Sequence, residues 1–114
     1  MKIIIKAKNF EATDATESFI GKKFEGVHKF LDIAELFVTV KKETLHHKKG
    51  DIFVAEAVVI VPGKKIVAES ESDDLFKSII ACRDELKLEI EKYKVKHIDK
   101  NRIEQRKSKK ETNL

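Results

Sequence analysis

Two adjacent histidines and four lysines fall within the eleven residues VKKETLHHKKG, residues 40–50. Imidazoles can ligate a metal, and lysines can bind phosphate. The metal site is the least favoured interpretation, because His46 and His47 would point to opposite faces of a strand and no third Cys or His lies nearby. Lys48 and Lys49 would also repel a cation. An anion-facing loop and a plain solvated hairpin both stay open as interpretations.

The other reactive groups do not form a catalytic set. Cys82 falls in an apolar helical stripe, where a small core residue is expected. His28 and His97 lie at the edge or end of predicted helices, and Glu85 and Glu89 have the spacing of a solvated ion-pair face. The sequence has no phosphate loop, nucleophile elbow or HExxH motif. We therefore expect a protein that is not an enzyme and that uses no cofactor and no metal.

Cations recur along both predicted helices. At 100° per residue, Arg83, Lys87 and Lys94 fall within about 40° of one another, on one flank of an apolar stripe. Lys92 and Lys96 fall on the other flank. The lysines of the first predicted helix are Lys22, Lys23 and Lys29. Such rows bind phosphate or only keep a surface soluble, and both interpretations stay open.

Length and composition indicate one soluble domain. The 114 residues are 41% hydrophobic, enough for a single core, and carry a formal net charge of +4. Cations and anions nearly cancel between residues 51 and 98, whereas residues 1–50 and 99–114 each carry an excess of three cations. The single cysteine suits a reducing compartment, and no apolar stretch is long enough to span a membrane, so we expect a cytoplasmic protein. One Tyr, with Phe mostly in apolar stripes, favours phosphate and shape recognition of folded RNA over base stacking.

Residues 1–31 predict a strand and a helix. The alternation in MKIIIKAKNF places Ile3, Ile5 and Ala7 on one face of a strand. A helix over residues 13–31 follows, because Thr13 can cap it and apolar residues recur at helical spacing. Those apolar residues are Ile20, Phe24, Val27 and Leu31.

Three further strands are predicted in ELFVTVKKE, IFVAEAVVIVP and KKIVAESE. Pro62 and Gly63 predict a tight turn between the last two. The stretch VKKETLHHKKG, between the first two, would form a long hairpin loop or the extended ends of these two strands. The positions expected to face the core are Leu36, Val38, Val40, Phe53, Ala55, Ala57 and Val59.

A long second helix is predicted over residues 73–97, and its apolar stripe contains Leu75, Ile79, Cys82, Leu86, Ile90 and Tyr93. Residues 99–114 are polar and basic, which predicts a disordered tail after a folded domain over residues 1–98. The fold class is α+β, in the order β-α-β-β-β-α. Both helices would cover one face of the sheet and leave the other to solvent or a partner.

Three segments resemble the short ribosome hibernation factors, also described as ribosome-associated inhibitors or sigma-54 modulation proteins. They are MKIIIKAKNFEATDATESFIGKKFEGVHKFLD, DIFVAEAVVIVPGKKIVAES and DDLFKSIIACRDELKLEIEKYKVK, in the expected order within residues 1–98. The resemblance implies two helices packed on one face of a four-stranded mixed sheet, similar in shape to a double-stranded-RNA-binding domain.

The resemblance also implies a mode of action. Members of the family bind the small ribosomal subunit, within the 70S ribosome, where mRNA and tRNA are decoded, and so inhibit translation under stress or in stationary phase. The implied partner is therefore rRNA, with no membrane and no small-molecule substrate. An alternative is a modulator of a sigma-54-type transcription factor, which would bind through the outer sheet face near Val54, Val58 and Ile60.

The family's cationic helix positions are only partly retained. They fall here on Lys23, Gly26, Lys29, Glu85, Leu88 and Lys92. Arg83 and Lys87 can restore charge one turn away from the two departures on the second helix. The residues expected to contact rRNA are Lys23, Lys29, Lys48, Lys49, Arg83, Lys87, Lys92, Lys94 and Lys96.

We predict that Lys48→Glu/Lys49→Glu weakens binding to vacant ribosomes, because the change places anions where the loop would meet phosphates. The measurement is co-sedimentation on a sucrose gradient at moderate salt. The binding of the unsubstituted chain should also strengthen as the pH falls towards about 6, where imidazoles become cationic. Unchanged binding by the variant would identify the loop as a solvated turn.

Overall fold

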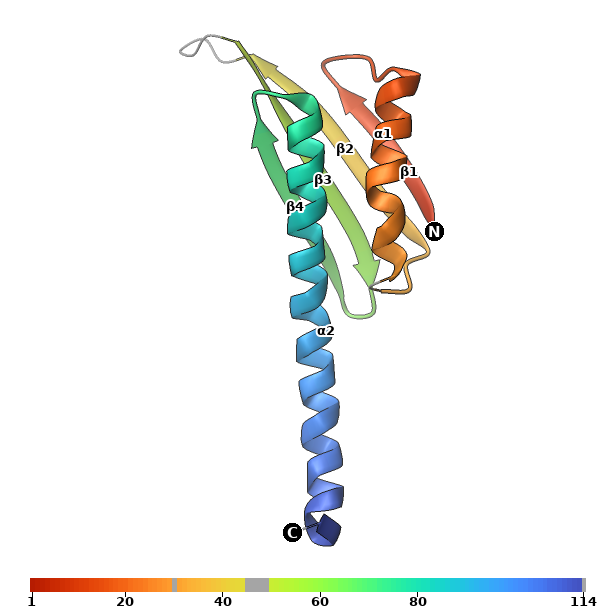
Figure 1. The fold of residues 1–114 in the computed structure, drawn as a ribbon, viewed down its shortest axis with the longest axis vertical. Helices are drawn as coiled ribbons and strands as arrows, with labels where there is room; N and C mark the ends of the chain where they lie inside the picture. The colour runs from red at the N-terminus through yellow and green to blue at the C-terminus, as the bar shows by residue number, and fades with distance from the viewer. Residues whose placement is uncertain (30, 45–49, 114) are drawn as a thin grey trace.

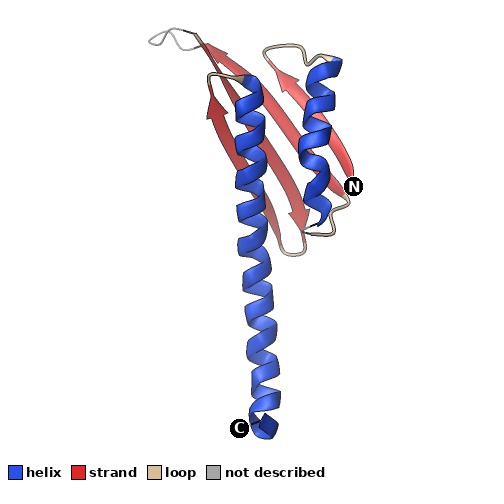
Figure 2. Ribbon diagram, viewed as in Figure 1, coloured by secondary structure: helices blue, strands red, loops and turns tan. Residues whose placement is uncertain are grey.

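The computed structural model describes residues 1–29, 31–44 and 50–113, with side chains described as far as Val95. The elements follow one another in the order expected from the sequence (Figures 1 and 2). They are β1 (Lys2–Lys8), α1 (Asp14–Glu25), the 3-10 helix η1 (Gly26–Lys29), β2 (Glu35–Thr44), β3 (Asp51–Val61), β4 (Lys64–Ser72) and α2 (Leu75–Asn113).

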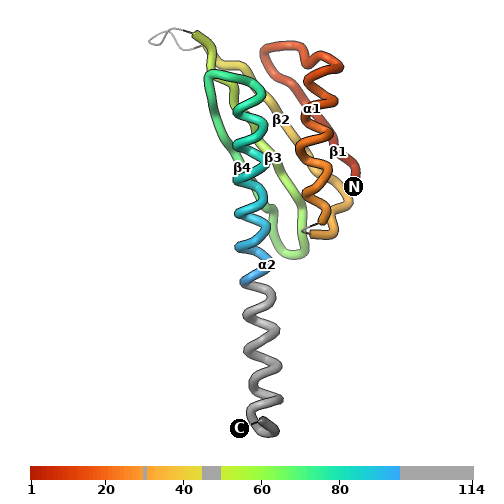
Figure 3. The backbone as a smooth tube through the Cα atoms, in the orientation of Figure 1, coloured from red at the N-terminus to blue at the C-terminus, as the bar shows by residue number. Residues whose placement is uncertain are grey.

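The four strands form one mixed sheet in the order β1-β2-β3-β4. β1 runs parallel to β2, which requires the crossover that α1 provides, and the other neighbours are antiparallel. Both helices lie on the same face of the sheet, and Figure 3 shows that they run in the same direction. The expected α+β fold, with two helices on one face of a mixed sheet, is confirmed. No helix of the described part is long and apolar enough to cross a membrane.

The core lies between the helices and the sheet. Every strand position expected to face it is fully buried except Ala7 and Phe53, which are half-buried, and Ile3 and Ile5, which pack against the core while remaining partly exposed. Ala55, Ala57 and Ala68 line the part of the sheet covered by α2, and small side chains there let the helix approach closely. The Sγ of Cys82 donates to the carbonyl oxygen of Ala68 at 3.6 Å, which confirms the expected core position of this cysteine.

Pro62 and Gly63 form the tight turn expected between β3 and β4. The turn joins the paired residues Val61 and Lys64. Gly63 has a φ of 83°, a conformation that residues with a Cβ rarely adopt. The two residues therefore fix the register of this hairpin.

The first helix ends earlier than predicted. Thr13 caps α1 by accepting a hydrogen bond from the backbone N–H of Thr16 at 3.1 Å. The α-helix stops at Glu25 rather than near residue 31, and a tighter 3-10 turn follows from Gly26. Gly disfavours the α-helix, and the tighter turn still buries Val27. Apolar spacing alone could not distinguish the two helix types.

Both predicted ends of the second helix differ from the structure. The carboxylate of Asp74 accepts hydrogen bonds from the backbone N–H groups of Phe76 and Lys77, so α2 begins at Leu75 rather than 73. The main chain is helical to Asn113, well past the predicted end at 97. Residues 99–113 contain no Gly or Pro and many strong helix formers, so the loss of apolar period did not mark a helix end. The division into a domain over 1–98 and a tail over 99–114 stays a prediction.

We predict that the thiol of Cys82 is protected in the folded protein. Burial raises its pKa to about 12, so the thiol ionises only in the unfolded chain when the pH rises above its ordinary value. From about pH 9 upward, this group should lower the free energy of unfolding by about 1.4 kcal/mol per pH unit.

The free energy of unfolding is measured with urea at about pH 8 and about pH 10, for the unsubstituted protein and for Cys82→Ala. It should fall less between the two pH values in the variant. A thiol reagent should modify the native protein far more slowly than the urea-unfolded protein. Equal pH dependence in both proteins, or equal reaction rates in both states, would contradict the burial argument.

Candidate nucleic-acid interface

The two helices meet through an aromatic pair. The rings of Phe19 in α1 and Phe76 in α2 pack edge to face, with centroids 4.6 Å apart. The Nζ of Lys23 lies 5.4 Å from the centroid of Phe19, within the range of a cation–π interaction. Phe19 and Lys23 therefore occupy the side of α1 that faces α2.

Three cations of α2 share the direction of Phe76. At 100° per residue, the side chains of Arg83, Lys87 and Lys94 point within about 20° of the direction of Phe76 around the helix axis. Since Phe76 contacts α1, this flank of α2 faces α1. We call Lys23, Arg83, Lys87 and Lys94 the cationic strip. All four are half-buried, which agrees with a position between the two helices rather than on the outermost surface.

Two of the acidic residues of α2 lie on the flank opposite the cationic strip. Glu85 and Glu89 lie on the opposite flank of the helix, beside Lys92, whose Nζ is 3.2 Å from the Glu89 carboxylate. Lys64 of β4 lies near the same flank, with its Nζ 5.8 Å from the ring centroid of Tyr93. The substitution of a family cation by Glu85 therefore does not place an anion in the strip.

The structure brings together only part of the predicted contact set. Lys92 lies apart from the strip, and Lys29 is exposed in η1, beyond the end of α1. Lys48 and Lys49, and the side chain of Lys96, lie outside the described residues. The predicted site thus separates into the cationic strip and positions around it.

Arg83 lies at the level of Gly26, one of the positions where the resemblance implies a cation. Gly26 follows Phe19, and Arg83 follows Phe76, by the same number of residues, which is a rise of about 10 Å along each helix. The helices run in the same direction (Figure 3), so equal rises from the Phe19–Phe76 contact place Arg83 and Gly26 at a similar height. Gly26 has an ordinary φ of −71°, and a Cβ added there would meet no atom within 4 Å. A side chain at position 26 would therefore begin in open space.

Arg83 is already partly neutralised. Its Nε and Nη2 both donate to one carboxylate oxygen of Asp84, at 3.1 and 2.9 Å. The Asp84 side chain is 57% exposed, and such surface ion pairs contribute little free energy. A phosphate can compete for this guanidinium.

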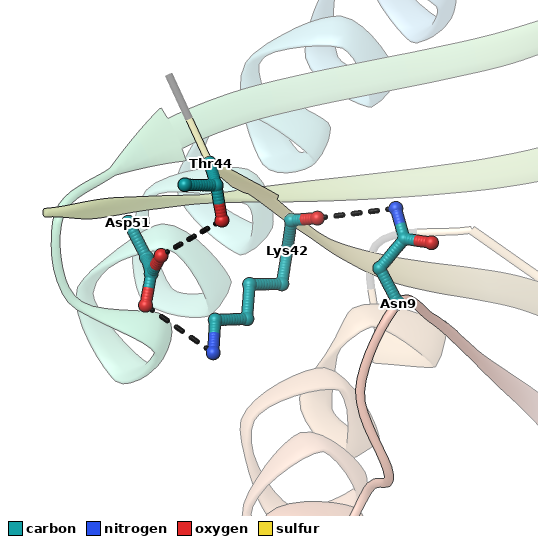
Figure 4. A network of polar contacts seen from close by, with 4 residues as sticks. All are labelled: Asn9, Lys42, Thr44 and Asp51. Carbon is teal, nitrogen blue, oxygen red and sulfur yellow. Dashed lines mark hydrogen bonds and ion pairs between the residues drawn. The ribbon is translucent and has the colours of Figure 1, made fainter. Parts of the chain in front are cut away.

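A polar network lies at the end of β2 and the start of β3 (Figure 4). Asp51 accepts a hydrogen bond from Thr44 at 3.0 Å and pairs with the Nζ of Lys42 at 3.2 Å. These two contacts hold the pKa of Asp51 below its ordinary value. The side-chain amide of Asn9 donates to the carbonyl oxygen of Lys42, and Asn9 has the positive φ of 67° that Asn tolerates. The network ties the end of β1 to the base of the hairpin.

Two of the four lysines in VKKETLHHKKG are paired with carboxylates. Besides the Lys42 pair, the Nζ of Lys41 lies 2.8 Å from Glu43, which raises the pKa of Lys41. Within the described part of the chain, no group of three or more His, Cys, Asp and Glu could hold a metal. His46 and His47 lie outside that part. The phosphate-binding interpretation of the stretch therefore depends on Lys48 and Lys49.

The sequence reasoning did not anticipate the aromatic pair. Phe19 and Phe76 are far apart in the sequence, and neither belongs to the apolar stripe predicted for its helix. One signal was present, because Phe76 follows Leu75 directly and lies at one edge of the apolar stripe, about 100° from Leu75. Phe76 is 43% exposed, so the helical layer presents an aromatic surface next to its cations.

Comparison with known proteins shows the family to which the chain is similar. Residues 3–98 match the family described as "Sigma 54 modulation protein / S30EA ribosomal protein". The chain is 29% identical over 104 residues to the ribosome hibernation promoting factor of Acinetobacter guillouiae, covering 87% of this chain and 92% of that protein. It is 29% identical over 97 residues to the factor of the same name from Escherichia coli strain K12, covering 84% and 96%.

Two solved structures share the fold. A ribosomal subunit interface protein from Coxiella burnetii superimposes with a TM-score of 0.69 at 23% identity, over 83% of this chain and 99% of that one. The N-terminal domain of Protein Y from Thermus thermophilus gives a TM-score of 0.64 at 26% identity, over 82% and 99%. The arrangement of two helices on one face of the sheet is therefore shared with these proteins.

Proposed function

Because the chain belongs to the sigma-54 modulation protein and S30EA ribosomal protein family, we propose that it is a ribosome hibernation factor. It binds the small ribosomal subunit at the mRNA and tRNA decoding region and inhibits translation under stress or in stationary phase. A factor of this kind acts in the cytoplasm, where ribosomes are. The contacts are made by cations with rRNA phosphates, and no reaction is catalysed.

The cationic strip is the observation that carries this proposal. Its four cations converge from two helices onto one side of the molecule, while Glu85 and Glu89 of α2 face away from them. Half-buried lysine and arginine stems pack along the helices and leave the charged ends available, so less side-chain freedom is lost on binding. Phosphate contacts of this kind position a protein on RNA without reading its sequence.

Inhibition follows from occupancy alone. A rigid α+β domain held by phosphate contacts excludes any RNA that needs the same space. Phe19 and Phe76 add an apolar surface next to the cations, which suits a ribose or an unstacked base at the same contact. Lys29 and Lys92 extend the cationic surface on either side, and Lys48, Lys49 and Lys96 are proposed as further contacts.

A second candidate function is modulation of a transcription factor of the sigma-54 type. The observation that favours it is the exposed apolar surface on the sheet, where Ile60 is 62% and Val67 is 47% exposed. Such a complex would survive nuclease treatment and high salt in a pull-down, because it would not depend on phosphate contacts. A ribosome complex would not survive either treatment.

We predict that Lys23→Gln/Arg83→Gln/Lys87→Gln loses most of its affinity for vacant ribosomes. With about six phosphates engaged, the affinity of the unsubstituted protein should fall roughly a thousandfold between 50 and 200 mM salt. Removal of three contacts should lower the slope of log affinity against log salt by about 2.7 on the duplex rule. Glutamine retains much of the side-chain stem, so the fold should be preserved.

The matched control is Lys2→Gln/Lys8→Gln/Lys65→Gln, which removes the same charge from the outer face of the sheet and leaves the helical layer intact. Binding is measured by sedimentation at several salt concentrations. The control should retain nearly all of the affinity and the full salt slope. Equal losses in both variants would show that only net charge matters and would count against the strip.

We predict that Gly26→Lys strengthens ribosome binding, because it restores a cation beside Arg83 in open space. One added phosphate contact corresponds to a gain of up to about tenfold near 0.1 M salt. Gly26→Gln is the control, since it makes the same change in backbone freedom without the charge. Equal affinities of the Lys and Gln variants would show that no phosphate lies near this position.

A further inference from the structure

The outer face of the sheet, opposite the helices, carries an apolar row across all four strands. The register pairs Ile4 of β1 with Phe37 of β2, Phe37 with Val58 of β3, and Val58 with Val67 of β4. These side chains are half-buried or exposed, with Val67 47% exposed. No helix or strand of the described part covers this row (Figure 1). The row is wide enough for a contact with another sheet.

Opposite charges lie at the two edges of the same face. Lys6 and Lys8 are on β1 at one edge, and Glu69 and Glu71 are on β4 at the other. The register places Lys6 in one row with Glu69, and Lys8 in the next row with Glu71. In each row the lysine on β1 and the glutamate on β4 are three strand spacings apart, about 14 Å, which is too far for an ion pair. Within the described part, none of the four side chains belongs to an ion pair.

This pattern is complementary to its own copy. A two-fold axis parallel to the strands exchanges β1 with β4 and leaves each row in place. It would set Ile4 against Val67 of a second copy, and Phe37 against Val58. The same rotation would set Lys6 against Glu69, and Lys8 against Glu71, at both edges of the contact. Two sheets pack about 10 Å apart, within reach of these long side chains.

We propose that the outer sheet face binds a second copy of this chain, face to face, as a two-fold symmetric dimer. The helical layers of both copies then point outward, so the inference does not depend on the proposed function. Three rows across four strands cover about 400 Å² on each copy, or about 800 Å² in total. This area is small for a stable complex, so the dimer is weak and depends on concentration and salt.

One row limits the contact. Continuing the register by one row places Lys2 and Lys65 at opposite edges, and the two-fold axis would bring these like charges together. Lys65→Glu turns this repulsion into attraction at two symmetric positions. The variant should therefore form the dimer at a lower concentration than the unsubstituted chain.

Charge exchange tests the arrangement, with sedimentation velocity of the full chain at low salt as the measurement. Lys6→Glu/Lys8→Glu and Glu69→Lys/Glu71→Lys should each be monomeric, because like charges then face one another. An equimolar mixture of the two variants should recover the dimer, since every edge contact is again between opposite charges. Recovery in the mixture also shows that both variants are folded. Lys22→Glu/Lys77→Glu, on the helical layer, is the control and should dimerise like the unsubstituted chain.

Three outcomes would overturn the proposal. One is an unsubstituted chain that stays monomeric at every concentration, with Lys65→Glu monomeric as well. Another is a dimer that persists unchanged in both charge variants, which would place the contact on another surface. The third is a mixture of the two variants that remains monomeric although circular dichroism shows each to be folded.

Discussion

The packing of α2 against the alanine-rich part of β3 and β4 is the constraint on which the rest of the structure depends. Ala55, Ala57 and Ala68 are small enough for the helix to lie close to the sheet, and Cys82 reaches the backbone of β4. This close approach excludes water from the core between the helices and the sheet, and burial of apolar surface is the main stabilising term. It also commits both helices to one face of the sheet.

The same packing fixes the rotation of α2 about its own axis. Once Ile79, Leu86 and Ile90 point into the core, every other position of the helix has a determined direction. The flank with Arg83 and Lys87 faces α1, and the flank with the glutamates faces away from it. The separation of charge on the helical layer is therefore a consequence of core packing, and the Phe19–Phe76 contact identifies which flank meets α1.

A sheet covered on one side leaves a second surface with its own pattern. The outer face retains an apolar row flanked by lysines at one edge and glutamates at the other, because alternate residues of each strand point away from the core. The helical layer and the outer face are thus independent surfaces of a small domain. The cations of the helical layer are suited to binding phosphate. The outer face is suited to binding a partner with the same charge pattern.

Much of the fold could be predicted from local pattern. Alternation identified the strands, and Pro62-Gly63 identified the turn, because a tight turn needs the backbone freedom of Gly. The ends of the helices were harder to predict from the sequence. The change at Gly26 from α to 3-10 geometry and the start at Asp74 depend on individual hydrogen bonds, and the continuation of α2 to Asn113 follows from helix propensity rather than from an apolar period.

The sequence by itself determined which residues are cations and how they are spaced on each helix, since side-chain direction within a helix depends only on position along it. Only the tertiary structure decided which of them lie on the same side of the molecule. Lys23 and Arg83 come from distant parts of the chain, and their neighbourhood depends on how two helices lie on a common sheet. The complementary edges of the outer face were equally hidden, because the pairing register that aligns Lys6 with Glu69 exists only in the folded sheet.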